Sequence, residues 1–198
     1  MATRSRILNF NMGKRIFDLI LALILIVLLS LPLLLIAAFI KLRSKGPVIF
    51  WTDRIGINNG IFKMAKFRTM KVNTPQVATH LMKDPGAYLV PGGALLRKYS
   101  LDELPQLFNV LKGDMSFVGP RPALFNQDDL VALRTKKGIH RLVPGITGWA
   151  QVNGRDDLPI PVKVTFDEYY LHHRSFGLDL YIIFLTALKV VKKEGVSH

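Results

Sequence analysis

A 22-residue apolar segment, Leu19 to Ile40, constrains the fold of this chain more than any other feature. The segment contains no charged residue, and as one helix it would be roughly 33 Å long, enough to cross a bilayer. A cleaved signal peptide is a poorer match, because the run is longer than a usual signal core and no small-x-small cleavage site follows it. A buried helix of a soluble protein normally carries polar residues along one stripe. The segment therefore predicts insertion into a membrane.

Two features predict that this segment bends instead of crossing. Pro32 lies near its middle and removes a backbone hydrogen bond, and Ser30 can satisfy a freed carbonyl. Basic residues flank both ends: Arg4, Arg6, Lys14 and Arg15 before it, and Lys41, Arg43 and Lys45 after it. Because Lys and Arg favour the cytoplasmic side, both ends are expected there. A re-entrant helix–break–helix satisfies both flanks, and an ordinary kinked span is the alternative that the residues alone leave open.

The charge balance indicates an anionic partner. The chain has 27 Lys and Arg against 14 Asp and Glu, a formal net charge of +13, which suits nucleic acid, anionic lipid or a phosphorylated substrate. Because 49% of the residues are hydrophobic, we expect membrane lipids and no nucleic acid as partners. The absence of cysteine excludes disulfides and thiolate zinc sites.

The region after Lys45 has a mixed composition and predicts a cytoplasmic domain over 46–198, separate from the membrane region 1–45. Pro47–Trp51 and Ile61–Met70 read as the arms of a hairpin around the turn signal Asn58–Gly60. Residues 71–93, rich in Pro and Gly, indicate a long loop. Helices are predicted over three segments. The first has an apolar stripe from Leu101 to Leu111, starts close to Asp102 and ends at Lys112–Gly113, and the others are Gln127–Lys137 and Phe176–Lys193. The last suits either core packing or an amphipathic helix in the membrane interface. The fold class is therefore α/β and helix-rich.

Two adjacent acids, Asp102 and Glu103, are the strongest candidates for chemistry. Ser100 to Glu103 fits the capping box, which places a helix start near Asp102 and favours acids in its first turn. Free amides at such a start attract phosphate. Consecutive helical residues point about 100° apart, so the two carboxylates should serve different purposes. One can attack phosphorus while the other binds a metal ion or handles a proton.

Basic residues recur around these acids in the sequence. A carboxylate approaches a phosphate only when cations neutralise the charge. Arg121 lies between two prolines that limit where its guanidinium points. The other candidates are Lys66 and Arg68, Arg97 and Lys98, and Arg155 at the end of a turn-rich loop. Each alone is commonly a solvated surface charge, but together, beside a membrane segment, they indicate a phosphorylated ligand.

Five motifs make the chain resemble a known family along nearly its whole length. They are KRIFD from Lys14, KFRTM from Lys66, LRKYSLDELPQLFNVLKGDMSFVGPRP from Leu96, RLVPGITGWAQVNGR from Arg141, and LDL around Asp179. These motifs resemble those of the monotopic phosphoglycosyl transferases, the bacterial sugar transferase family. By length the chain resembles the small stand-alone members that have only the catalytic core. Larger relatives carry additional N-terminal transmembrane helices.

The resemblance implies a reaction and a set of roles. A sugar 1-phosphate would pass from a UDP-sugar to a polyprenyl phosphate such as undecaprenyl phosphate, releasing UMP, as the first membrane step of glycoconjugate biosynthesis. Asp102 matches the family nucleophile that forms a covalent phosphosugar intermediate, Glu103 matches its partner, and Mg²⁺ is required at this pair. The residues matching substrate-binding positions are Lys66, Arg97, Arg121, Arg155 and Asp179. The expected location is the cytoplasmic face of the bacterial inner membrane.

The sequence departs from the family at the helix break. The family breaks its re-entrant helix at an adjacent Ser-Pro pair, whereas here Leu31 separates Ser30 from Pro32. Two functional alternatives stay open: a glycosyltransferase that uses the same substrates and releases UDP, and a basic membrane adaptor without activity. The sequence leaves the transferred sugar, the glycan pathway and the oligomeric state open.

Overall fold

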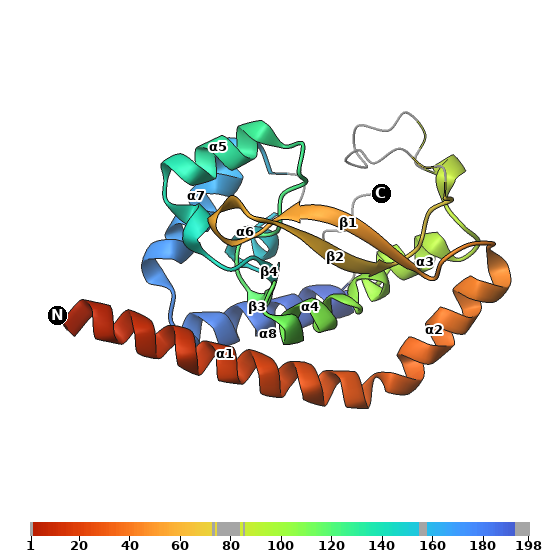
Figure 1. The fold of residues 1–198 in the computed structure, drawn as a ribbon, viewed down its shortest axis with the longest axis horizontal. Helices are drawn as coiled ribbons and strands as arrows, with labels where there is room; N and C mark the ends of the chain where they lie inside the picture. The colour runs from red at the N-terminus through yellow and green to blue at the C-terminus, as the bar shows by residue number, and fades with distance from the viewer. Residues whose placement is uncertain (1, 73, 75–83, 85, 155–157, 193–198) are drawn as a thin grey trace.

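The computed structural model describes residues 2–72, 74, 84, 86–154 and 158–192, with side-chain surroundings for those from 12 to 190. It is a helix-rich α/β fold with two small two-stranded sheets (Figure 1). The α-helices are α1 (Ala2–Leu28), α2 (Ser30–Arg43), α3 (Gly93–Lys98), α4 (Gln106–Lys112), α5 (Asp128–Lys136), α6 (Trp149–Val152), α7 (Ile160–His173) and α8 (Phe176–Lys192). The strands are β1 (Ile49–Ile55), β2 (Ile61–Phe67), β3 (Ser116–Val118) and β4 (Gly145–Thr147). Short 3₁₀ turns are η1 (Ile57–Asn59), η3 (Gly86–Tyr88), η4 (Leu101–Glu103) and η5 (Ile139–Arg141).

The predicted bend in the N-terminal apolar segment is confirmed. Helices α1 and α2 meet at Leu29 with an angle of 62°. The hydroxyl of Ser30 donates to the Val27 carbonyl at 2.8 Å, in the last turn of α1, where the bend disrupts the helical ladder. Among the described residues no single helix has the length and apolar character to cross a membrane, but this bent pair has them jointly. Insertion into a membrane stays a prediction.

The bent helix pair presents an apolar face that the rest of the chain leaves uncovered. Five side chains around the bend are each between 61 and 69% exposed: Val27, Leu28, Leu31, Leu34 and Leu35. Folded soluble domains rarely expose apolar patches of this kind unless the patch binds something. The face therefore suits apolar surroundings on the outside of the molecule.

Helix α1 is also packed against the region that follows residue 46. Ala22 is fully buried in the main hydrophobic cluster together with Val110 of α4. The guanidinium of Arg15 donates to the carbonyls of Val110 and Leu111 at the C-terminal end of α4, where carbonyls lack i+4 amide partners within the helix. In Figure 1, α4 lies between α1 and the β1–β2 hairpin. Helix α1 and the region after residue 46 thus share one core.

The predicted hairpin is confirmed, with β1 and β2 antiparallel from Ile49–Phe67 to Ile55–Ile61. Asn58 and Asn59 adopt positive φ angles in the connecting turn, a conformation that Asn tolerates well. The side chain of Asn109 on α4 accepts from the Ala65 amide at 3.0 Å and donates to the Lys63 carbonyl at 2.8 Å. These two bonds fix β2 against α4 and place the end of β2 beside η4.

The second sheet was not predicted. Strands β3 and β4 pair in parallel, through Ser116–Gly145 and Val118–Thr147, inside a segment that the sequence presents as turn-rich. A Cβ at Gly145 would lie 2.1 Å from the Gly119 nitrogen, so only glycine permits the two backbones to approach this closely. This pairing holds the Gly119–Pro122 turn next to the core.

The helix predictions have mixed outcomes. The end at Lys112–Gly113 is confirmed, since Gly113 has a φ of +96°, and α5 and α8 match their predicted ranges to within a residue. The start near Asp102 is wrong, because α4 begins at Gln106. Helix α7 was missed. Of the 23 residues in 71–93, the 11 at positions 73, 75–83 and 85 lie outside the described residues.

Candidate active site

Glu103 is the centre of a partly buried charge cluster built from three parts of the chain. Its Oε1 atom accepts from the Lys66 Nζ at 2.7 Å and from the Arg121 guanidinium at 2.9 Å. Lys66 comes from the end of β2, Glu103 from η4, and Arg121 from the turn after β3. The structure therefore brings together three residues that the sequence singled out.

The acids lie in a 3₁₀ turn and not in the first turn of an α-helix. Ser100 adopts a left-handed conformation, φ +53°, whereas a capping serine needs extended backbone, and its side chain makes no capping hydrogen bond. The Glu103 carboxylate binds Lys66 and Arg121, so it does not close a capping box. The capping-box prediction is wrong, and with it the expectation that a helix N-terminus at Asp102 attracts phosphate.

The two carboxylates differ in their electrostatics. Burial raises the pKa of Asp102 above its ordinary value and outweighs the opposing charges of Lys66, Arg97 and Arg121. Burial acts in the same direction on Glu103, but the contacts with Arg121 and Lys66 prevail and hold its pKa well below the usual range. Glu103 is therefore ionised at neutral pH, and Asp102 is the member of the pair that takes up a proton first as the pH falls. The sequence-based expectation of two distinct purposes agrees with this difference.

A buried ion pair that the sequence analysis missed supports Arg121. Arg134 on α5 binds the Asp167 carboxylate on α7 at 2.6 Å and donates to the backbone carbonyl of Arg121 at 2.8 Å. Both side chains of the pair are less than 10% exposed. Arg134 thus fixes the turn that carries Arg121. No local motif marks this pair, since its members are 33 positions apart in the chain.

The remaining predicted residues lie in different places. Arg97 on α3 is close enough to lower the pKa of Asp102, so it joins the cluster. Arg155 lies outside the described residues. Asp179 is buried between helices, where it accepts from Lys14 at 2.6 Å and from the Tyr170 hydroxyl at 2.7 Å. That position anchors α1 to α7 and α8, so Asp179 supports the site only through the fold.

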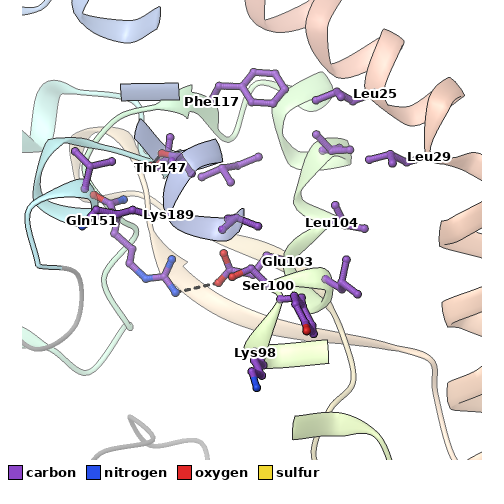
Figure 2. Close-up of a pocket in the computed structure, with 18 residues that line it drawn as sticks. Leu25, Leu29, Lys98, Ser100, Glu103, Leu104, Phe117, Thr147, Gln151 and Lys189 are labelled. Atoms are coloured by element: carbon purple, nitrogen blue, oxygen red, sulfur yellow. Dashed lines mark hydrogen bonds and ion pairs between the residues drawn. The ribbon is translucent and has the colours of Figure 1, made fainter. Parts of the chain in front are cut away.

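A cavity of about 340 Å³ begins at Glu103 and extends to the bend of the N-terminal helices. Its walls come from α1, the segment around η4, β3, β4, α6 and α8 (Figure 2). In this view Leu25 of α1 and Leu29 at the bend lie on one side, Gln151 and Lys189 on the other, and Glu103 between them. Asp102 is not among the described residues that line it.

The described part of the chain contains no metal site made by protein ligands alone. Within the described ranges, no group of three or more His, Asp or Glu side chains is placed to hold an ion. Asp102 and Glu103 supply two carboxylates at adjacent positions. Mg²⁺ commonly takes only one or two carboxylates and completes its shell with water and substrate phosphates. The pair therefore fits Mg²⁺ when a phosphorylated substrate shares it.

Comparison with known proteins gives consistent matches. The family described as "Bacterial sugar transferase" matches residues 9–193. The "Uncharacterized sugar transferase EpsL" of Bacillus subtilis is 43% identical, over 93% of this chain and 90% of that protein. The "UDP-glucose:undecaprenyl-phosphate glucose-1-phosphate transferase" of Escherichia coli is 42% identical over 89% of this chain, and 39% of that protein. The "UDP-N-acetylgalactosamine-undecaprenyl-phosphate N-acetylgalactosaminephosphotransferase" of Aeromonas hydrophila is 40% identical over 92% of this chain, and 44% of that protein.

Proposed function

The chain belongs to the bacterial sugar transferases, and from this we propose that it moves a sugar 1-phosphate from a UDP-sugar to a polyprenyl phosphate and releases UMP. The observation that carries the proposal is the partly buried cluster of Asp102 and Glu103 with Lys66, Arg97 and Arg121. It pairs a nucleophile with the cations that a diphosphate requires. The similar proteins are named for different sugars, glucose and N-acetylgalactosamine, so the transferred sugar stays open.

In the proposed reaction, a carboxylate oxygen of Asp102 attacks the β-phosphorus of the UDP-sugar. The bond from that phosphorus to the bridging oxygen breaks, UMP leaves, and an aspartyl phosphosugar remains. A phosphate oxygen of the polyprenyl phosphate then attacks the same phosphorus and releases Asp102. The cations around Glu103 stabilise the negative charge that develops on the phosphoryl oxygens in both steps. The products are UMP and a polyprenyl diphosphate sugar.

We propose Mg²⁺ as the cofactor, held by Asp102 and Glu103 together with substrate phosphate oxygens. When bound, the ion would neutralise charge on the diphosphate and make UMP a better leaving group. Lys66 and Arg121 do part of this work from the protein side, because their contacts keep Glu103 ionised and bring positive charge to the same place.

The experiment that tests this function is a panel of UDP-sugars with undecaprenyl phosphate, scored for the nucleotide released. UMP with at least one sugar, and a lipid diphosphate product, are expected. UDP without UMP would instead indicate a glycosyltransferase, and no nucleotide release with any sugar would favour the adaptor alternative.

We also propose that the bent α1–α2 pair is a re-entrant membrane element and that the protein acts at the cytoplasmic face of the bacterial inner membrane. The uncovered apolar face at the bend supports this, as do the basic flanks on both sides of it. A soluble sugar nucleotide and a lipid phosphate meet at such an interface. The amphipathic α8 contributes further exposed apolar side chains, among them Phe184 at 58% exposure.

Single cysteines test this topology directly, because the natural chain has none. In Ala2→Cys and Ser44→Cys we expect both thiols to react with a membrane-impermeant maleimide only from the cytoplasmic side, in inverted but not right-side-out vesicles. Asn58→Cys in the hairpin turn is the cytoplasmic control. Labelling of positions 2 and 44 from opposite sides would mean that the segment crosses the membrane.

The pH dependence of the first half-reaction should report Asp102. Burial raises the pKa of Asp102, and the attacking carboxylate is lost by protonation as the pH falls through that raised pKa. The acid limb in the pH profile of kcat/KM for the UDP-sugar should therefore lie at a higher pH than the ordinary pKa of an aspartate. Lys66 is the largest opposing influence on this pKa, so Lys66→Met should move the limb further toward higher pH. Lys63→Met, on the exposed side of the same strand, should leave the limb unmoved. An unchanged limb in Lys66→Met would contradict the assignment of this titration to Asp102.

A further inference from the structure

We propose that the cavity between the helix bend and Glu103 holds the acceptor, with the first isoprenoid units of the polyprenyl chain inside it and the phosphate at Lys189. This inference rests on the proposed function and assigns the second substrate to a particular place. The cavity has a volume of about 340 Å³, which is within the range of small-ligand pockets.

The lining of the cavity suits a hydrocarbon chain. Apolar side chains from α1, η4, α4, β3, β4, α6 and α8 form most of the wall, including Leu25, Leu29, Leu104, Phe117, Ile146 and Val152. Leu25 belongs to the last turns of α1, and Leu29 lies at the bend itself. The two residues immediately before Leu29, Val27 and Leu28, carry the uncovered apolar face. A chain that leaves the cavity at the bend would therefore continue into apolar surroundings.

The polar side of the cavity suits a phosphate. Lys189 lines it from α8, and among the described residues its ammonium group has no hydrogen bond or ion pair. Gln151 lines the same side, is 6% exposed, and has no partner within the described chain for either atom of its amide. Buried amides normally have partners, so an unpartnered one in a cavity wall indicates a polar group of a ligand. A phosphate oxygen can accept from both side chains.

The position of the cavity relative to the two acids favours the acceptor over the donor. The UDP-sugar must place its β-phosphorus against Asp102, yet the cavity is lined by Glu103 and Arg121 and not by Asp102. A ligand whose phosphate lies at the end of the cavity lined by Glu103 and Arg121 is next to Asp102 but does not fill the place that the β-phosphorus of the UDP-sugar needs. That is the arrangement that a second substrate needs when it attacks a phosphosugar already attached to Asp102.

Two substitutions separate the phosphate from the chain. Lys189→Met should lower kcat/KM for undecaprenyl phosphate by about 10- to 100-fold, as expected for loss of a hydrogen bond to a charged group. Val190→Trp should lower it as well by filling the cavity, and because Val190 is 42% exposed the fold should tolerate the larger ring. Neither should change kcat/KM for the UDP-sugar, which in a double-displacement reaction depends only on the first half. Lys112→Met, at a lysine that is 74% exposed outside the cavity, is the matched control.

Direct binding keeps the inference testable apart from turnover. In nanodiscs of phosphatidylethanolamine and phosphatidylglycerol, farnesyl phosphate should bind the wild type, and Lys189→Met should weaken it while leaving farnesol unaffected; Val190→Trp should weaken both. If the wild type released no UMP, the proposed function would fail. The binding measurement would still show whether the cavity holds a prenyl phosphate. Equal losses for both substrates in Val190→Trp would assign the cavity to the donor. Unchanged lipid binding in both variants, or equal competition by phosphatidic acid, would overturn the proposal.

Discussion

Asp102→Asn is expected to lower turnover at least about 10³-fold, the minimum usually seen when a covalent nucleophile is removed. The amide keeps the size and burial of the side chain but has no anionic oxygen to attack phosphorus. The wild type, incubated with a UDP-sugar and no lipid acceptor, should gain the mass of one sugar phosphate on the peptide that contains Asp102. The variant should show no such adduct.

The control for this substitution is Asp128→Asn, which removes an exposed carboxylate at the start of α5 and should keep normal turnover. Glu103→Gln provides a second comparison, because it should slow the reaction through loss of the Lys66 and Arg121 contacts and still form the adduct. Full turnover of Asp102→Asn, or an adduct located on Glu103, would contradict the assignment of the nucleophile.

The features that the sequence predicts well are those with local causes. The bend follows from a proline within an apolar run, the hairpin from two strand patterns around Asn58–Gly60, and the end of α4 from a glycine with positive φ. Each of these depends on residues within a few positions of each other. Lys66 and Arg121 were singled out differently, as basic residues in motifs that resemble those of the family, and their ion pairs with Glu103 were not predicted.

The features that the sequence did not predict have distant causes. A capping box at Ser100 needs the Glu103 side chain to accept from the Ser100 amide. The Glu103 carboxylate instead accepts from Lys66, which is 37 positions away in the chain. The parallel β3–β4 pair needs two short segments brought together by the intervening chain, and three-residue strands carry little periodicity. Asp179 matches a site motif, yet its ion pair with Lys14 joins helices 165 positions apart in the chain, and its contact with Tyr170 depends on how α7 and α8 pack. Local patterns contain no information about such partners.

The ion pair between Arg134 and Asp167 is the strongest case of a distant cause, and Arg134→Met is expected to destabilise the fold severely. The substitution leaves the Asp167 carboxylate, which is 2% exposed, buried without its partner. Breaking a buried pair from one side typically costs about 3–5 kcal/mol, which in a chain of this size lowers the midpoint of thermal unfolding by roughly 6–20 °C. Thermal unfolding in detergent micelles, followed by circular dichroism, measures this change.

The double variant Arg134→Met/Asp167→Leu should recover much of the lost stability, because no charge stays buried. Burial raises the pKa of Asp167 even with Arg134 beside it, and Arg134→Met removes the largest influence that lowers this pKa. Protonation then relieves the unpaired carboxylate, so the deficit of Arg134→Met should shrink as the pH falls. Arg134 also donates to the carbonyl of Arg121, so the double variant should stay slow in UMP release although it is folded. A double variant as unstable as the single one would show that the ion pair is not the cause. One with full activity would show that Arg121 keeps its position without Arg134.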